Sequence, residues 1–405
     1  MKELANGLDK LKCTGCTACV EICPNKCIKM VEDEHGFFYP IKDSKLCINC
    51  GLCKKVCPIL NNIVKTTSLF KQKVYALESN NEKLVLKSSS GGAFSTIAEA
   101  FCKQGDYYIF GARFDENLNV IHDYISNIKD IEIFRKSKYV QSNLRNSYSL
   151  VEKFLKDNKK VLFTGTPCQI AGLKSYLGRD YDNLLLVDLV CHGVPSQKIF
   201  DMYIQEIEKK YNKKVKFVQF REKVKMKNGR FNSRNIKLVF NNDKVIIEDS
   251  LKNAYLRGFQ NALFYRSSCG KCQFANPNRL SDITIADCWG IQNIYKDIDV
   301  HKGISMVVVN TKKGGSLINE FYKKCKLKEL DIDFAIKNNA QFSSPAKFHK
   351  NRNYFFENFE KIDFSKLVNK CVKVSKTKQL LRKLSPSFIK NIYKKLNKRI
   401  DKNEK

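Results

Sequence analysis

The sequence predicts an α/β protein in three parts: a small cysteine-rich α+β domain over residues 1–66, a larger α/β domain over residues 67–340, and a basic helical tail over residues 341–405. Eight cysteines occur in two regularly spaced runs before residue 60, and from Val74 onward short strands alternate with glycine-containing turns and helices. With 405 residues, 43% hydrophobic and 28% charged, the chain has the composition of a globular protein of two or three domains.

The eight early cysteines form two copies of one pattern, C-x2-C-x2-C-x3-C-P. They are Cys13, Cys16, Cys19, Cys23, Cys47, Cys50, Cys53 and Cys57. Two-residue gaps let one loop supply three thiolates to a 4Fe-4S cluster, so that the fourth must come from elsewhere. In two-cluster ferredoxins the last cysteine of each run binds the other cluster. We therefore expect Cys57 to join the first three cysteines of the first run, and Cys23 to join those of the second.

Zinc is the alternative metal for these cysteines. Zinc knuckles also use C-x2-C spacing, but their ligands come as two pairs rather than as three plus one before a proline. Over residues 1–66 the chain resembles bacterial dicluster ferredoxins. Residues 37–39 are predicted to form a strand that shields the clusters from water, and Cys27 is expected to be a core residue rather than a ligand.

The larger domain shows the alternation that is typical of an α/β fold. Strands are predicted at VLFTG (161–165) and LLLVDLV (184–190), with a turn and a helix over residues 166–177 between them. VKFVQF (215–220) and NIKLVF (235–240) are expected to pair as a hairpin. This order indicates a mostly parallel sheet. Neither a dinucleotide-binding G-x-G-x-x-G nor a P-loop motif is present.

The formal net charge of +32 lies mainly outside the cysteine-rich part. Residues 1–66 hold 10 lysines against 7 acidic residues, whereas residues 366–405 hold 14 basic against 2 acidic residues. Such a field favours an acidic protein partner, an anionic membrane surface or nucleic acid. Over residues 387–400, Phe388, Ile392 and Leu396 form an apolar stripe among lysines. That pattern is typical of a helix packed on its domain, or of one lying on a membrane or a partner.

The start of the chain shows no signal-peptide pattern, and no apolar run approaches the ~20 residues that a membrane span needs. The cysteines cluster at metal-ligand spacing in a long chain, which is more typical of a reducing compartment than of a disulfide framework. We therefore expect a cytoplasmic protein.

Four further cysteines lie in settings that suit a metal site. Cys168 begins a predicted helix, Cys191 follows a predicted strand, and Cys269 and Cys272 form SCGKC. The carboxyl ends of parallel strands are where open α/β sheets place their sites, and helix amino termini stabilise thiolates. On spacing alone, these cysteines either bind a third 4Fe-4S cluster or serve as ordinary small apolar residues.

An ordered set of motifs carries a resemblance over about residues 74–315. These motifs are GGAFSTI, SKYVQS, FTGTPCQIAGL, DLVCHG, SCGKC and RLSDITIADCWGI followed by KGIS. In this order they resemble the coenzyme F-420 hydrogenase/dehydrogenase beta-subunit family. The resemblance implies an FAD beside one 4Fe-4S cluster bound by Cys168, Cys191, Cys269 and Cys272. Cys288 stands where the family commonly has an aromatic residue, so a further ligand or a redox-active thiol is an open alternative there.

The resemblance also assigns residues to the flavin: Ser90, Gly91, Gly92, Lys138, Tyr139, Gln141 and Ser142. Glycines followed by a helix allow close backbone approach and direct free N–H groups at a pyrophosphate, although a serine-capped helix after a flexible turn has the same pattern. His192 is a candidate proton donor, or a hydrogen-bond donor to sulfur. Lys225, Lys227 and Arg230, in the predicted hairpin loop, suit either an anionic ligand or solvent.

These observations predict an iron-sulfur flavoprotein oxidoreductase that passes electrons between an acidic carrier of ferredoxin or flavodoxin type and an organic two-electron partner. That partner is a small molecule or a coenzyme. The alternatives are a coenzyme F-420 dehydrogenase or hydrogenase beta subunit and a pure electron-transfer subunit. A cluster-bearing nucleic-acid binder is disfavoured, because no aromatic-interleaved recognition motif accompanies the charge.

Overall fold

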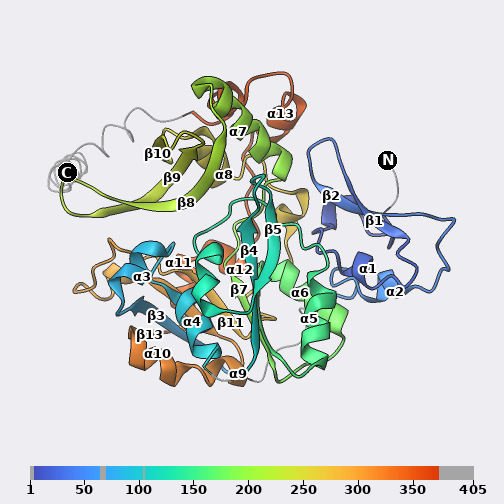
Figure 1. Cartoon of the computed structure of the whole chain (residues 1–405), viewed down its shortest axis with the longest axis horizontal. Helices are drawn as coiled ribbons and strands as arrows, with labels where there is room; N and C mark the ends of the chain where they lie inside the picture. The colour runs from blue at the N-terminus through green and yellow to red at the C-terminus, as the bar shows by residue number, and fades with distance from the viewer. Residues whose placement is uncertain (1–3, 64–69, 104, 374–405) are drawn as a thin grey trace, which may run out of the picture.

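The computed structural model describes residues 4–63, 70–103 and 105–373, and its centre is an eight-stranded sheet (Figure 1). The strand order is β13-β3-β12-β11-β7-β6-β4-β5. In this order the strands span Cys325–Leu330, Lys73–Ser79, Ser305–Val309, Ile283–Asp287, Leu184–Leu189, Lys160–Gly165, Tyr107–Phe114 and Val120–Ile125. The strands predicted over residues 161–165 and 184–190 are confirmed as β6 and β7.

The sheet is mixed rather than mostly parallel. β4, β6, β7 and β11 run parallel at the centre, whereas β5, β12, β3 and β13 pair antiparallel with their neighbours. A parallel pair needs a long crossover, but a short turn over residues 115–119 joins β4 to β5 and makes that pair antiparallel. The parallel centre matters for function because its carboxyl ends lie at one edge of the sheet.

Helices cover both faces of this sheet. On one face α4 and α10 pack Ile97 and Phe321 against Leu162. On the other face α5 and α6 pack Val151 and Leu173 against Phe163. The helices around the sheet are α3 (Glu82–Lys87), α4 (Ala93–Phe101), η3 (Ile128–Phe134), α5 (Ser147–Lys156), α6 (Pro167–Leu177), α9 (Lys312–Gly315), α10 (Ile318–Lys324), α11 (Ile332–Asn338) and α12 (Ala340–Ser343).

A second, three-stranded sheet lies beside the first. The predicted hairpin is confirmed as β8 (Val215–Lys225) and β9 (Phe231–Phe240). The third strand of the sheet, β10 (Val245–Asp249), pairs with β9 and was not predicted from the sequence. Four helices share an aromatic-rich core with this sheet: α7 (Gln197–Tyr211), α8 (Ala254–Gln260), α13 (Arg352–Glu357) and α14 (Phe364–Cys371).

The chain beyond residue 340 is folded onto these cores as far as the structure describes it. Phe355, Phe364 and Leu367 are fully buried with α7 and α8. The basic helix predicted over residues 387–400 lies outside the described residues. Among the helices that the structure describes, none combines the length and apolar character that crossing a membrane requires.

The N-terminal domain, blue in Figure 1, packs beside α5 and α6. It contains the antiparallel pair β1 (Ile28–Glu32) and β2 (Phe38–Lys42) and two short helices, α1 (Ala18–Glu21) and α2 (Leu52–Lys55). Phe37 and Tyr39 are buried as expected, while Phe38 is 39% exposed.

Gly172 on α6 sets how closely the two domains approach. A Cβ atom at this glycine would lie 2.9 Å from Cys16 Cβ, 3.1 Å from Cys16 Sγ and 2.6 Å from the Tyr148 hydroxyl oxygen. A side chain at Gly172 therefore fits only if both the Tyr148 hydroxyl and Cys16 of the N-terminal domain shift.

We predict that Gly172→Ala destabilises the protein, although alanine favours a helix over glycine by about 1 kcal/mol. Crowding at a packed contact costs about 1–3 kcal/mol, so we expect the steric cost of the added methyl group to exceed the gain in helix propensity. Gly315→Ala is the control, because its Cβ would meet only Val309 at 3.8 Å and Phe70 at 3.9 Å. Thermal unfolding under anaerobic conditions should show a lower midpoint for Gly172→Ala only. Equal midpoints for the two variants would contradict the close contact.

Candidate iron-sulfur and cofactor site

The structure brings Cys57 together with the first three cysteines of the first run. Cys13, Cys16, Cys19 and Cys57 line one small cavity in the N-terminal domain, as cross-ligation between the runs requires. Three of these cysteines are buried, and we call this set the inner cysteine group.

The remaining cysteines of the two runs lie nearer to solvent. We call Cys23, Cys47, Cys50 and Cys53 the outer cysteine group; Cys50 is exposed, and the other three are partly buried. Cys27 is buried next to this group, with its Sγ atom 3.3 Å from Cys23 Sγ. Cys27 therefore packs against the outer group.

A second cavity is lined by the four cysteines that the sequence singled out downstream; because they form the third cysteine group, we call it the third cysteine cavity. Cys168 lies at the start of α6, Cys191 follows β7, Cys269 lies in η4 (Ser267–Lys271), and Cys272 ends that turn. A capping box between Thr166 and Gln169 fixes the start of α6. Cys168 and Cys272, which are far apart in the chain, are thus held around one space.

Burial makes these thiols poor thiolates on their own. Desolvation raises the pKa of Cys16 to about 12 and that of Cys168 to about 11, and the charges of neighbouring cysteines act in the same direction. Desolvation also raises the pKa of Cys269 to about 12. Because a metal ligand must be deprotonated, such groups become thiolates only when a metal centre supplies compensating charge.

The cysteine sulfurs are spaced more widely than in a four-cysteine zinc site. Four thiolates on one Zn²⁺ at about 2.3 Å would lie roughly 3.8 Å from one another. Among the described residues, no three cysteines have their Sγ atoms all within 4.8 Å of one another. A 4Fe-4S cluster binds each thiolate to a different iron and therefore separates the sulfurs further.

A much larger pocket opens at the carboxyl edge of the parallel strands. Its volume is about 330 Å³, and residues after β6, β7 and β11 line it. Open α/β sheets bind ligands at this edge, and small-molecule pockets have volumes of about 300–1,000 Å³. Cys168, Cys191 and His192 line both this pocket and the third cysteine cavity.

Six of the seven residues expected at the flavin line the large pocket: Ser90, Gly92, Lys138, Tyr139, Gln141 and Ser142. Gly91 lies behind it. A Cβ atom at Gly91 would lie 2.2 Å from Leu77 O and 2.7 Å from Ser305 N, so this glycine serves the packing of the sheet. Gly92 has φ +98° and lies directly before α4.

Several of these side chains are already engaged within the protein. The Lys138 ammonium donates to the Ile133 and Arg135 carbonyls at 3.1 and 2.7 Å, and desolvation lowers its pKa to about 7. The Tyr139 ring stacks on Phe259 with ring centroids 4.1 Å apart. These contacts fix the positions of both side chains in the pocket wall.

A buried network missed by the sequence analysis holds Ser142. His122 Nδ1 lies 2.8 Å from Ser142 Oγ, and Gln169 Nε2 donates to the same oxygen at 2.9 Å. Desolvation lowers the pKa of His122 to about 4, so the imidazole is neutral at physiological pH. The network links β5 to the start of α6 and orients this side of the pocket.

Arg221 was also missed. A bulge in β8 gives it φ +61°, and its guanidinium pairs with Asp287 at 2.8 and 2.9 Å in the pocket wall. Bulges commonly redirect a side chain in this way beside a site. The Nε atom of Arg221 is buried and has no hydrogen-bond partner among the described residues.

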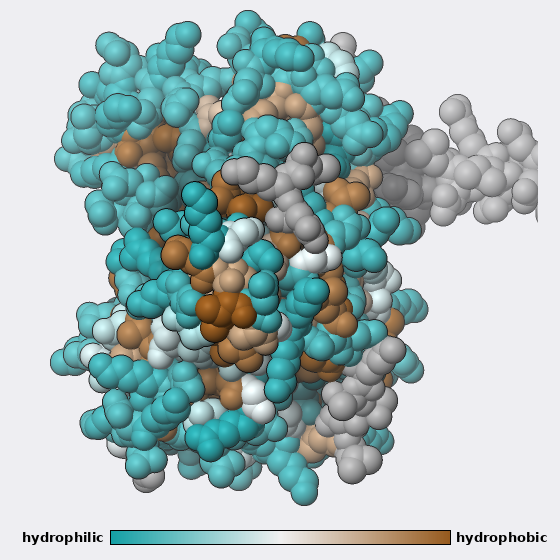
Figure 2. Space-filling view, turned by 90° about the vertical axis from the view of Figure 1, so that its right-hand side faces the viewer, coloured by the Kyte–Doolittle hydropathy of each residue, from teal (hydrophilic) through white to brown (hydrophobic). Residues whose placement is uncertain are grey.

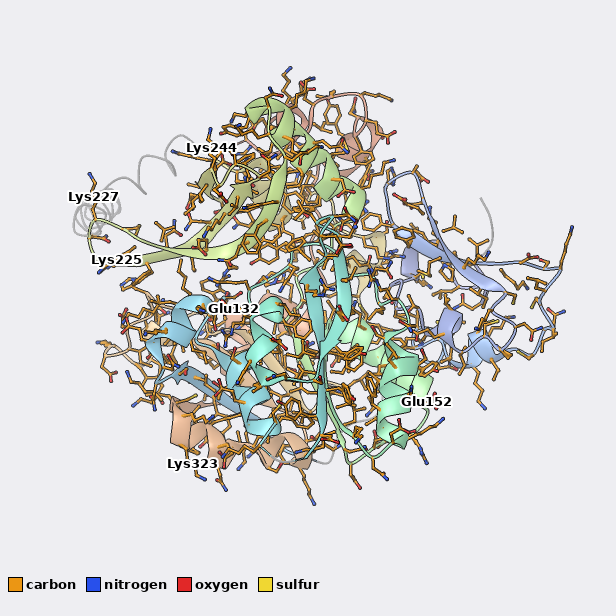
Figure 3. All side chains as sticks on the ribbon, viewed as in Figure 1. Glu132, Glu152, Lys225, Lys227, Lys244 and Lys323 are labelled. Carbon is orange, nitrogen blue, oxygen red and sulfur yellow. The ribbon has the colours of Figure 1, made fainter. Side chains whose placement is uncertain are left out.

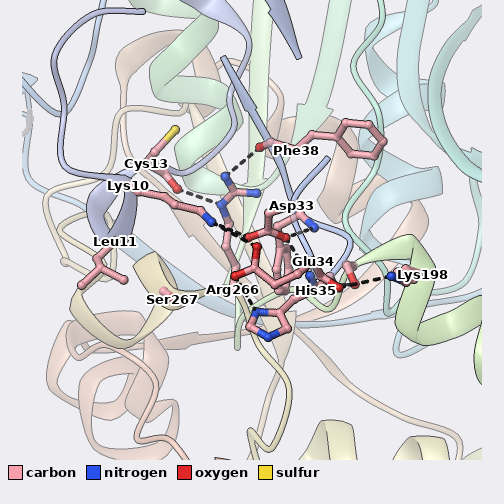
Figure 4. Close-up of polar contacts among 12 residues, drawn as sticks. Lys10, Leu11, Cys13, Asp33, Glu34, His35, Phe38, Lys198, Arg266 and Ser267 are labelled. Carbon is pink, nitrogen blue, oxygen red and sulfur yellow. Dashed lines mark hydrogen bonds and ion pairs between the residues drawn. The ribbon is translucent and has the colours of Figure 1, made fainter. Parts of the chain in front are cut away.

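Arg266 joins the N-terminal domain to the α/β domain (Figure 4). It is 1% exposed, and it donates to Cys13 O at 2.8 Å, Phe38 O at 2.9 Å and the Gln141 side chain at 3.1 Å. Gln141 in turn donates to Thr14 O at 3.0 Å. Arg266 also lines the third cysteine cavity. A buried cation therefore lies between the inner cysteine group and the third cavity.

Two further polar clusters are surface features. Asp33, Glu34 and His35 lie close together, but Lys10 pairs with Asp33 at 2.9 Å and the Glu34 carbonyl accepts from Lys198 (Figure 4). These contacts hold the β1–β2 turn against α7. The other cluster, Lys225, Lys227 and Arg230, lies at the exposed end of the β8–β9 hairpin and does not line the described pocket (Figure 3 labels the two lysines).

The difference in exposure predicts how iron is lost. During anaerobic incubation with an excess of an iron chelator, we expect about four irons to leave quickly from the outer group. The remaining iron should leave at least tenfold more slowly, because its ligands are buried. Absorbance of the iron-chelator complex follows the reaction. Loss of all iron in one phase would contradict the unequal exposure.

Comparison with known proteins agrees with this division of the chain. Residues 158–333 match a family described as the C terminus of the beta subunit of coenzyme F420 hydrogenase/dehydrogenase. Residues 12–60 match the family described as the 4Fe-4S dicluster domain.

Two curated ferredoxins and one solved structure are similar to parts of the chain. An uncharacterized ferredoxin from Methanocaldococcus jannaschii is 38% identical over 61 residues, which are 14% of this chain and 78% of the relative. A 7Fe ferredoxin from Hydrogenibacillus schlegelii is 43% identical over 42 residues, 10% of this chain, and the chain spans only 47% of its length.

The solved structure is of the F420-reducing [NiFe] hydrogenase complex from Methanosarcina barkeri. The alignment has a TM-score of 0.44 and 15% identity, and it covers 71% of this chain and 92% of the other. From the motifs and the two family matches, the chain carries a domain of the coenzyme F420 hydrogenase/dehydrogenase beta-subunit family, matched over residues 158–333, and a 4Fe-4S dicluster domain in front of it.

Proposed function

We propose that this iron-sulfur electron-transfer protein holds a third 4Fe-4S cluster and FAD, and exchanges electrons between an acidic carrier protein and an organic two-electron partner. The family match favours the beta-subunit alternative over an independent ferredoxin-fed reductase. A deazaflavin of the coenzyme F420 type is therefore the proposed organic partner, and further subunits are expected because the family is named for a beta subunit.

One observation carries this proposal. Cys168 and Cys191 stand in the wall between the third cysteine cavity and the large pocket. A cluster bound by these cysteines would lie directly beside a ligand in the pocket. On the other side, Cys16 contacts α6, the helix that Cys168 begins. The three cysteine groups and the pocket thus form one continuous series.

The large pocket offers hydrogen-bond donors for the phosphates of a flavin dinucleotide and apolar side chains for its rings. Ser88, Ser89 and Ser90 precede the amino terminus of α4, where backbone N–H groups and the helix dipole favour a phosphate. The unpartnered Nε atom of Arg221 adds a buried cationic donor. Apolar side chains such as Phe134 and Val187 line other parts of the wall.

When bound, FAD supplies the conversion between one-electron and two-electron chemistry, which clusters alone cannot perform. The residues of this chain hold and orient it. His192 lies in both cavity walls and is the proposed proton donor to the organic partner. Gly193, with φ +124°, turns the backbone between the pocket and Tyr265.

Cofactor content tests the proposal directly. Anaerobically purified protein should contain about twelve irons, twelve sulfides and one FAD per chain. Cys168→Ser with Cys272→Ser should remove about four irons and leave the ferredoxin-type signals unchanged. Cys102→Ser, outside all three cysteine groups, is the control and should keep all iron. About eight irons in the unmodified protein would exclude the third cluster, and absence of flavin would exclude the flavoprotein assignment.

Arg266 gives a second test through reduction potentials. A unit charge ~6 Å away at an effective dielectric constant of ~20 is worth about 3 kcal/mol. For a one-electron couple this is on the order of 100 mV. We predict that Arg266→Gln lowers the potential of the nearest cluster by about this amount, because reduction adds negative charge beside a lost cation. An EPR-monitored redox titration measures the shift, with Arg113→Gln, at the surface ion pair with Asp123, as control. Unchanged potentials would contradict this role.

A further inference from the structure

The two cysteine runs fold into loops of the same shape. In the first loop Gly15 and Thr17 have φ +70° and +62°, and in the second loop Asn49 and Gly51, at the equivalent positions, have φ +53° and +76°. A helix of four residues follows each loop, α1 after the first and α2 after the second. The sequence repeat is therefore also a repeat in three dimensions, and each loop serves as a reference for the other.

The first loop is covered by the α/β domain. Thr14, directly after the first cysteine, is 7% exposed, and its carbonyl accepts from Gln141. Ala18 is fully buried in the core that includes α5 and α6. Gly15 lies against Arg266. These residues of the first loop therefore contact the α/β domain.

The second loop presents the same positions to solvent. Ile48, the equivalent of Thr14, is 62% exposed, and Leu46, on the other side of Cys47, is 55% exposed. Cys50 is exposed as well. No described residue covers these side chains. Figure 2, which looks at the right-hand side of Figure 1, where the N-terminal domain lies, shows apolar side chains at several places on a mostly hydrophilic face.

Positive charge lies on the segments next to this loop. Six exposed lysines belong to them: Lys42 and Lys45 before Cys47, Lys54 and Lys55 on α2, and Lys26 and Lys29 on the segment where Asn25 donates to Leu46 O. The exposed acidic residues near them in the chain are Asp43 and, further along β1, Glu32. None of the six lysines forms an ion pair with another residue in the part of the chain that the structure describes. Apolar residues ringed by unpaired charge of mainly one sign are typical of a docking surface for an oppositely charged protein.

We propose that the second loop, with Leu46 and Ile48 at its centre and the six lysines around it, is the docking surface for an acidic iron-sulfur or flavin redox protein. This inference rests on the proposed function and names its protein partner's site. In the transfer step the reduced carrier loses one electron, and the cluster bound by the outer cysteine group gains it, without a proton or a chemical bond changing. The charge ring steers the partner, and the apolar centre brings its redox group close to Cys50.

The test measures how fast the clusters of the full-length protein are reduced, from their visible absorbance, under anaerobic conditions. The donors are an acidic 2[4Fe-4S] ferredoxin and reduced methyl viologen. Lys45→Glu/Lys54→Glu/Lys55→Glu reverses the charge at the docking surface. Its control, Lys210→Glu/Lys213→Glu/Lys244→Glu, makes the same charge change at exposed lysines of the three-stranded-sheet region. Ile48→Thr installs the residue that the first loop uses at the same position.

We expect the first triple variant to raise the half-saturating ferredoxin concentration at least tenfold at low salt, and Ile48→Thr to raise it several-fold. The control should match the unmodified protein, viologen should reduce every variant equally, and salt should slow reduction by ferredoxin alone. Equal half-saturation for the two triple variants, or no effect of salt on the unmodified protein, would overturn the proposal.

Loss of a cluster could imitate weaker docking, so iron is measured for each variant. If the first triple variant loses iron, the proposal is judged on Ile48→Thr and on the salt dependence of the unmodified protein. The readout also requires only the ferredoxin-type clusters. Missing FAD or a missing third cluster would therefore refute the proposed function while leaving the docking result valid.

Discussion

The buried guanidinium of Arg266 is the interaction on which the arrangement of the redox sites depends. It donates to two backbone carbonyls of the N-terminal domain and to Gln141 of the α/β domain. Its ring contacts are also in the N-terminal domain, with Tyr39 4.3 Å away. Burying a charge without a counter-charge is costly. Among the described residues no carboxylate pairs with Arg266, and an anionic cluster bound by the neighbouring cysteines would supply the missing counter-charge.

The main sheet then determines where the large pocket can form. Its parallel centre places the ends of β6, β7 and β11 at one edge, and Cys168 and Cys191 follow two of these ends. The outer antiparallel strands contribute differently: His122 on β5 and Ser305 on β12 support the pocket wall from the sides. A mixed sheet thus supplies both a ligand-binding edge and a rigid frame around it.

The sequence predicted the parts that depend on local spacing, and it did not predict the parts that depend on long-range packing. The cysteine runs, β6, β7 and the β8–β9 hairpin are visible in motifs, alternation and turns. The direction of the outer strands is not visible in the sequence, because the residue pattern of a strand does not show which other strand it pairs with. Arg221 and Arg266 were missed for a related reason: a bulge and a domain contact give them their roles. Gly91 shows the same limit, since its tight contact with Leu77 and Ser305 across the sheet is not visible in the motif that assigned it to a ligand.

The repeated loop explains why burial and charge must be balanced along the series of sites. Reducing a cluster adds negative charge, which a dry environment disfavours and water favours. The outer loop is solvated, whereas the inner loop, of the same shape, is enclosed. Enclosure alone would therefore make the inner cluster harder to reduce than the outer one and would obstruct inward electron flow. We propose that the Arg266 guanidinium, which donates to the Cys13 carbonyl, would offset that penalty without exposing the cluster to water. In this proposal the residue that joins the two domains also supplies the charge that the inner site needs.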